Sequence, residues 1–224
     1  MKRLLFYPMI MVLAWLAISC DDMNDPHEPY LREGEIIYAS KVDSVGVRSG
    51  NMRLALNIYI KTQRIQKGIL YWNNKMDSLE VSLEGIRGNV FKEVVIENLE
   101  EKSYVFNLIS YDANNNKSLP FEVVGNVYGE NYSSSLLNRT IDKIEKVDNK
   151  AVITWRRGSE ALGVKIKYIN DEGEAKEIFV ESDADETEIE DFVSGEEFSY
   201  VTFYKPEENA LDIFEAPERV QTFP

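Results

Sequence analysis

The sequence predicts an all-β protein in which a signal peptide is followed by two tandem antiparallel β-sandwiches. Three observations support this fold class. From Glu33 onward, apolar residues recur at every second position, which is the period of a strand rather than the 3.6-residue period of a helix. Asn, Asp, Gly and Ser separate the short apolar runs, as they do in turns. The series of expected strands then occurs a second time along the chain.

Residues 1–19 have the organisation of a lipoprotein signal peptide. A short basic segment precedes Leu4–Ile18, which is a nearly uninterrupted apolar run. This run has the length of a secretory hydrophobic region and is short for a membrane-spanning helix, which is the alternative interpretation. The stretch Leu16–Cys20 (LAISC) resembles the bacterial lipobox, whose cysteine is lipidated and becomes the first residue of the mature protein. Ala17 stands where that motif usually has leucine.

Lipid on Cys20 would anchor the protein to a membrane. Each buried methylene contributes about 0.8 kcal/mol, so several acyl chains hold a folded domain at the bilayer. The acidic residues after Cys20 resemble the signal that sends Bacteroidetes lipoproteins to the outside of the cell. In enterobacteria, an aspartate at Asp21 would instead resemble an inner-membrane retention signal. We expect a lipid-anchored outer-membrane protein exposed at the cell surface, with residues 20–33 as an extended tether.

Residues 34–128 are expected to form the first sandwich. The clearest strand is Met52–Lys61, where Leu54, Leu56 and Ile58 alternate with residues of the opposite face. Turn residues lie between the runs. The other expected strands are Glu35–Ser40, Lys41–Val47, Gly68–Trp72, Leu79–Leu83, Phe91–Ile96, Tyr104–Tyr111 and Phe121–Val127.

Residues 140–224 are expected to form the second sandwich, and residues 129–139, with a glycine and three serines, the linker between the two. No segment shows a helical apolar stripe longer than three turns. The expected strands are Ala151–Trp155, Leu162–Ile169, Ala175–Glu181, Thr187–Ile189, Phe198–Tyr204 and Glu218–Phe223.

Two stretches of the chain correspond to each other and resemble a known corner. In IENLEEKSYVFNLISY one strand ends at Leu99 and the next begins at Tyr104, and IEDFVSGEEFSYVTFY does the same with Phe192 and Phe198. Both resemble the E–F corner of fibronectin type III domains, where these residues fill the space between the two sheets. Trp155, in AVITW, resembles the core tryptophan of strand B in that fold.

Four stretches resemble a Bacteroidetes family of surface lipoproteins, which is a domain of unknown function with fibronectin type III-like folds. They are GEIIYASKVDSVGV, ILYWNNKMDSLEV, VVGNVYGENYSSSLLNR and FSYVTFYKPEENALDIFEAP. The resemblance implies an outer-membrane lipoprotein, often encoded near glycan-uptake systems, and it implies no catalytic residues.

The composition limits the partners and the kinds of catalytic or metal site that the protein can have. The formal net charge of −14 disfavours nucleic acid as a partner, because such a surface repels phosphates. A single cysteine excludes internal disulfides and cysteine zinc sites, and the single histidine, His27, lies in the tether. Paired carboxylates fall at turns and strand ends, where a solvated role is expected. We therefore expect no enzyme, no catalytic residue, no cofactor and no metal site.

Aromatic residues are the best binding candidates, because sugars stack on rings that offer large area at low entropic cost. Alternation places Tyr71 and Trp72 on opposite faces, so that one is core and the other exposed. The candidates are Trp72, Tyr111, Tyr128 and Tyr132. For the last two, packing between the sandwiches is the favoured alternative.

Two tripeptides, at Ser44 and Ser78, resemble the O-glycosylation motif of exported Bacteroides proteins. Together the observations predict a non-catalytic surface lipoprotein that acts in adhesion or glycan capture near an outer-membrane uptake system. Its partners would be the membrane, through Cys20, and a glycan or another surface protein. The alternative is a structural spacer or protein-interaction module of an outer-membrane complex.

Overall fold

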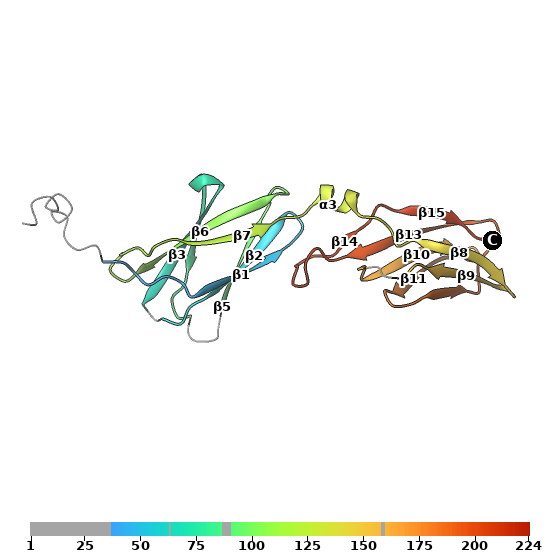
Figure 1. The fold of residues 1–224 in the computed structure, drawn as a ribbon, viewed down its shortest axis with the longest axis horizontal. Helices are drawn as coiled ribbons and strands as arrows, with labels where there is room; N and C mark the ends of the chain where they lie inside the picture. The colour runs from blue at the N-terminus through green and yellow to red at the C-terminus, as the bar shows by residue number, and fades with distance from the viewer. Residues whose placement is uncertain (1–36, 63, 87–90, 158–159) are drawn as a thin grey trace, which may run out of the picture. The chain divides into compact units, whose positions relative to one another are not determined.

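The computed structural model describes residues 37–62, 64–86, 91–157 and 160–224, and strands dominate them (Figure 1). The signal peptide, Cys20 and nearly all of the tether lie outside the described residues. Residues 37–43, part of which was expected to be strand, have no regular secondary structure.

The first sandwich consists of two antiparallel sheets. One contains β1 (Ser44–Ser49), β2 (Arg53–Tyr59) and β5 (Phe91–Glu97), in that order. The other has the order β4 (Asp77–Ser82), β3 (Ile65–Trp72), β6 (Ser103–Asp112) and β7 (Phe121–Asn126). A short 3-10 helix, η2 (Asn73–Lys75), joins β3 to β4. In strand letters, the sheets are A-B-E and C′-C-F-G.

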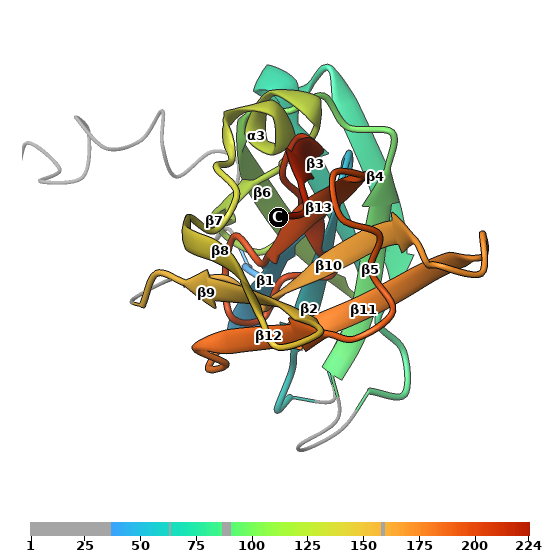
Figure 2. The ribbon, with the colours of Figure 1, turned by 90° about the vertical axis from the view of Figure 1, so that its right-hand side faces the viewer.

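The second sandwich repeats this arrangement (Figure 2). One sheet contains β8 (Ile141–Val147), β9 (Lys150–Trp155) and β12 (Glu186–Ile189). The other has β11 (Ala175–Glu181), β10 (Gly163–Ile169) and β13 (Glu197–Tyr204), and both β14 (Phe214–Glu215) and β15 (Arg219–Thr222) pair with β13. The same strand order in both halves confirms the predicted fibronectin type III-like fold class. Between the halves lies α3 (Glu130–Ser135), a short helix in the segment expected to be a plain linker.

Each sandwich encloses its own core. Leu54, Leu56 and Phe106 are fully buried in the first, and Leu99 and Tyr104 of the predicted corner also belong to its core. In the second sandwich, the core residues include Trp155, Ile153, Ile166, Phe192 and Phe198. Trp155 is 2 % exposed and lies on β9, which confirms the predicted core tryptophan of strand B.

Two strands were missed, each for a local reason. A bulge between Ile141 and Lys143 shifts the register of β8, so Ile141 and Ile144 both pack against the core although they are three residues apart. This spacing hides the period of two. The other missed strand is β14: the last strand of the second sandwich is divided around Pro217, which has no N–H for a ladder, and only its second part, β15, lies within the expected Glu218–Phe223.

Candidate functional site

Two tyrosines lie on the outer face of the β4-β3-β6-β7 sheet. Tyr71 of β3 pairs with Asn107 of β6, and Tyr111 of β6 pairs with Lys67 of β3. Because side chains alternate across a strand and Leu70 is fully buried, Tyr71 faces away from the core. We call the outward set on these two strands the tyrosine face; it comprises Lys67, Ile69, Tyr71, Asn107, Ile109 and Tyr111.

The Tyr111 hydroxyl on the tyrosine face is protonated at neutral pH, as any tyrosine with an ordinary pKa of about 10 is. Burial, with the neighbouring Tyr71 as a smaller cause, raises the pKa of Tyr111. The Lys67 ammonium lies 5.7 Å from the centre of the Tyr111 ring and forms an ion pair of 3.0 Å with Glu80. The Tyr111 hydroxyl is therefore a neutral group that can donate and accept hydrogen bonds.

Trp72, one of the four aromatic candidates named from the sequence, packs inward. Its ring centre lies 6.0 Å from that of Phe106, and its partly buried side chain packs against the core of the first sandwich. Of the two adjacent rings, Tyr71 is the one on the outer face. Sequence reasoning established that one of the two faces outward, but it put forward the other residue.

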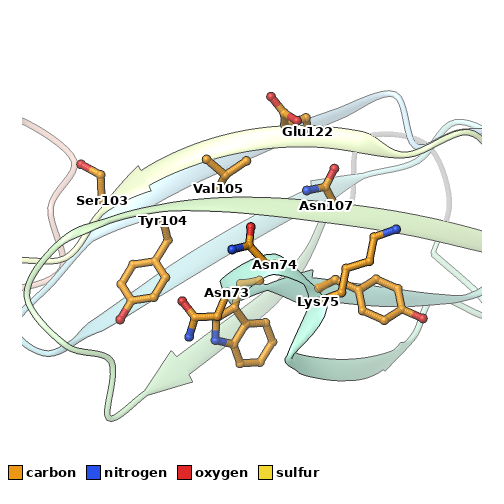
Figure 3. A pocket seen from close by; sticks show the side chains of 10 residues that line it. Asn73, Asn74, Lys75, Ser103, Tyr104, Val105, Asn107 and Glu122 are labelled. Atoms are coloured by element: carbon orange, nitrogen blue, oxygen red, sulfur yellow. The ribbon is translucent and has the colours of Figure 1, made fainter.

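A hollow of about 610 Å³ adjoins the tyrosine face where β3 ends (Figure 3). Tyr71, Trp72 and Tyr104 contribute aromatic groups to it. The amide side chains come from Asn73, Asn74 and Asn107. Figure 3 shows the Asn107 amide and the Tyr104 ring on opposite sides of the β6 ribbon, with Asn73 and Asn74 at the turn beside it. The hollow thus combines apolar rings with groups that both donate and accept hydrogen bonds.

The turn beside the hollow has an unusual backbone. Asn73, Asn74 and Lys75 have φ values of 47°, 56° and 65°, so three consecutive non-glycine residues are left-handed. Asparagine tolerates this conformation, but lysine does not favour it. The Asn73 amide donates to Asp77 at 2.7 Å, which helps to hold the turn. Strain of this kind is concentrated at binding sites, and here it borders the hollow.

Tyr128 and Tyr132, the other two candidates, form an aromatic cluster with Phe214. Their ring centres are 4.7 Å apart, and that of Tyr132 lies 5.1 Å from Phe214. Burial raises the pKa of both hydroxyls. Since Phe214 belongs to β14, the two tyrosines join the segment after β7 to the second sandwich within the compact unit 39–224.

Asp212, in the loop before β14, was not singled out from the sequence. We call the contacts of this loop with the first sandwich the joint. The Asp212 carboxylate accepts hydrogen bonds from Arg53 Nε at 2.9 Å and Nη2 at 2.6 Å, and from the Asn51 N–H at 2.8 Å. These bonds hold the pKa of Asp212 below its ordinary value, with the Arg53 hydrogen bonds as the largest cause. Nearby, the Leu211 N–H donates to the Ser49 carbonyl at 2.7 Å.

The two serines of the glycosylation motif are both exposed, at the start of β1 and on β4. Ser78 is the cross-strand neighbour of Tyr71. Cys20, the lipidation candidate, lies outside the described residues. Across residues 37–224, apart from the undescribed gaps, no cluster of three His, Cys, Asp or Glu side chains could hold a metal ion. Within the same described ranges, no helix is long and apolar enough to span a membrane.

Comparison with solved structures finds fibronectin type III proteins. The FN1–FN3 domains of chicken CNTN1 match at 10 % identity and a TM-score of 0.40, covering 81 % of this chain and 64 % of that one. A two-domain fibronectin type III segment of chicken tenascin matches at 13 % identity and a TM-score of 0.31, covering 81 % of this chain and 98 % of that one.

Comparison of the sequence with curated proteins gives no match. A family model does match, over residues 20–214, and its description is a domain of unknown function, DUF4998. The matched region begins at Cys20 and includes both sandwiches up to β14. Since it covers most of the sequence, the chain belongs to the DUF4998 family.

Proposed function

We propose that this chain is a non-catalytic binding protein that captures carbohydrate on the tyrosine face and in the adjoining hollow. It acts at the cell surface, anchored to the outer membrane by lipid on Cys20. The fold is consistent with an interaction or adhesion module, although function depends on the site and not on the fold.

The observation that carries the proposal is the outward pair Tyr71 and Tyr111 beside a hollow lined by three asparagine amides. A pyranose ring presents an apolar C–H face and a rim of hydroxyls. Tyrosine rings offer flat apolar area, and with two side-chain torsions they lose little entropy on binding. Amides can both donate to and accept from hydroxyls. A rigid sheet holds these groups in place, as a preformed site requires.

The surface location is supported by the lipobox-like Leu16–Cys20 and by the acidic residues that follow it. An association with a glycan-uptake system is supported by the resemblance to Bacteroidetes surface lipoproteins. In that setting, a tethered protein with an affinity for sugars would raise the concentration of substrate near a transporter.

A glycan array probed with the mature protein tests the proposal. We expect binding to a neutral oligosaccharide, and a loss of about tenfold for both Tyr71→Ala and Tyr111→Ala, since a buried stacking contact is worth more than about 1 kcal/mol. Phe91→Ala is the matched control, because Phe91 is a 43 %-exposed ring on the other sheet of the same sandwich. Equal binding by all variants, or no carbohydrate signal, would contradict the proposal.

The joint at Asp212 favours a second candidate, a spacer or protein-interaction module of an outer-membrane complex. Besides the Asp212 contacts, the Asn209 amide donates to the Val47 carbonyl at 3.0 Å and Arg48 Nε donates to the Asn209 carbonyl at 3.2 Å. Such a joint suits a protein that has to hold a partner at a fixed distance. A spacer gives no signal on the array, whereas its pull-down partner is lost when the joint is broken by Asp212→Ala.

A further inference from the structure

A second aromatic site lies on the equivalent sheet of the second sandwich. Phe179 of β11 pairs with Lys165 of β10, and Phe203 of β13 pairs with Gly163 of β10. The two phenylalanines thus flank β10, with ring centres 5.9 Å apart. Phe179 is 53 % exposed although it is a large apolar residue. Neither ring belongs to the core of the second sandwich.

Gly163 allows the Phe179 ring to lie across the strand. A Cβ at position 163 would lie 2.4 Å from Cζ and 2.8 Å from Cε1 of Phe179, far inside van der Waals contact. Any other residue at this position would push the ring away. The exposed ring therefore rests on a glycine and presents its other side to solvent, which is the geometry of a stacking platform.

Lys165 supplies a cation to the same site. Its ammonium lies 5.1 Å from the centre of the Phe203 ring, and among the described residues no carboxylate forms an ion pair with it. By contrast, the next outward lysine, Lys167, lies 3.9 Å from a carboxylate oxygen of Glu177. Two glutamates lie next to the site on the neighbouring strands: Glu181 pairs with Gly163, and Glu215 pairs with Phe203.

We infer that Phe179, Phe203 and Lys165 form a binding site for an acidic saccharide. A sugar ring stacks on Phe179, and its carboxylate pairs with the Lys165 ammonium, which the Phe203 ring holds in position. Lys165 favours an acidic ligand over a neutral sugar, because its ammonium forms no ion pair among the described residues and can pair with a ligand carboxylate. The formal net charge of −14 repels long polyanions, so the site suits a short oligosaccharide or the end of a chain.

The site is separate from the tyrosine face, so the two can be tested independently. The probe is trigalacturonic acid, titrated into the ¹⁵N-labelled mature protein at low salt, with galactotriose as the neutral comparison. We expect shifts confined to β10, β11 and β13, and weaker binding of galactotriose. Phe179→Ala should weaken trigalacturonate binding about tenfold. Lys165→Gln should weaken it about threefold to fivefold at low salt and by less at high salt.

Matched variants distinguish stacking at this site from a general attraction of the anion to the protein surface. Gly163→Ala should weaken binding by displacing the ring, although it leaves both Phe179 and Lys165 in the chain. Phe91→Ala should bind trigalacturonate as the unmodified protein does, because Phe91 lies in the first sandwich and outside both proposed sites. The inference is overturned if trigalacturonate causes no shifts, if Phe179→Ala binds it unchanged, or if an acidic peptide binds at these residues while the saccharide does not.

Discussion

Replacing Asp212 with alanine removes the most strongly bonded contact between the loop before β14 and the first sandwich. The carboxylate accepts three hydrogen bonds, two of them from the Arg53 guanidinium. Bonds to charged groups contribute about 1.5–3 kcal/mol each when buried, and exposed ion pairs about 0.2–1 kcal/mol. The Asp212 side chain is 22 % exposed and that of Arg53 is 37 % exposed, so this pair lies between the buried and the exposed case. We therefore expect a loss of about 2 kcal/mol, or about 4–8 °C in Tm.

Urea and thermal unfolding of the mature protein measure this loss. If the joint couples the two sandwiches, Asp212→Ala should also broaden the transition or divide it in two, because the halves then unfold separately. Asp142→Asn is the control: its ion pair with Arg156 is exposed and lies within the second sandwich, so it should change stability by less than about 0.5 kcal/mol. Equal effects of the two substitutions would refute the reasoning.

The same contact predicts a pH dependence. Hydrogen bonds from Arg53 hold the pKa of Asp212 below its ordinary value of 3.8. A carboxylate whose pKa is lowered by folding stabilises the protein above the pKa of the unfolded state, and this stabilisation is lost as the pH falls through the folded-state pKa. The stability difference between the unmodified protein and Asp212→Asn should thus be full at pH 6 and decrease as the pH falls below 3.8. A difference that does not change with pH would contradict this assignment.

Three further substitutions test the fold, with urea midpoints as the measurement. Gly125→Ala would place a methyl 2.4 Å from Leu54 Cδ1 and should destabilise the first sandwich by about 1–3 kcal/mol; an unchanged midpoint would contradict this packing. Arg139→Met should cost about 2–3 kcal/mol, because its buried guanidinium donates to the backbone carbonyls of residues 156, 181 and 184, and retained stability would refute that role. Lys75→Gly relieves a left-handed lysine with φ of 65° and should stabilise by about 0.5–1 kcal/mol, whereas destabilisation would argue against strain at the hollow.

Local patterns allowed most strands to be predicted. A half-buried strand alternates in sequence, so the Met52–Lys61 pattern identified β2, and turn residues marked its ends. The bulge in β8 breaks this alternation, and only the paired strand β9 reveals which isoleucines face inward. The helix α3 has only six residues, and the Glu101 carboxylate, 30 residues earlier in the chain, accepts the Asn131 and Tyr132 N–H groups. Local sequence carries no sign of that contact.

Identifying the candidate sites required knowing which side chains of a strand point to the core and which point to solvent. Short apolar runs do not reveal this. In the run Ile69–Trp72 every residue is apolar or aromatic, so the sequence could not decide whether Tyr71 or Trp72 faces the core. The same ambiguity hid Phe179, which lies between Ile178 and Val180. Asp212 was missed for another reason: its partner Arg53 is 159 residues away, and no local pattern predicts such a pair.

The central claim is that the tyrosine face captures carbohydrate. Its most direct test is chemical-shift mapping of the ¹⁵N-labelled mature protein with the neutral oligosaccharide that gives the strongest array signal. We predict shifts concentrated on Lys67–Lys75 and Val105–Tyr111, and their loss in Tyr71→Ala. Shifts confined to the β1-β2-β5 sheet, or saturable binding that Tyr71→Ala leaves unchanged, would contradict the claim.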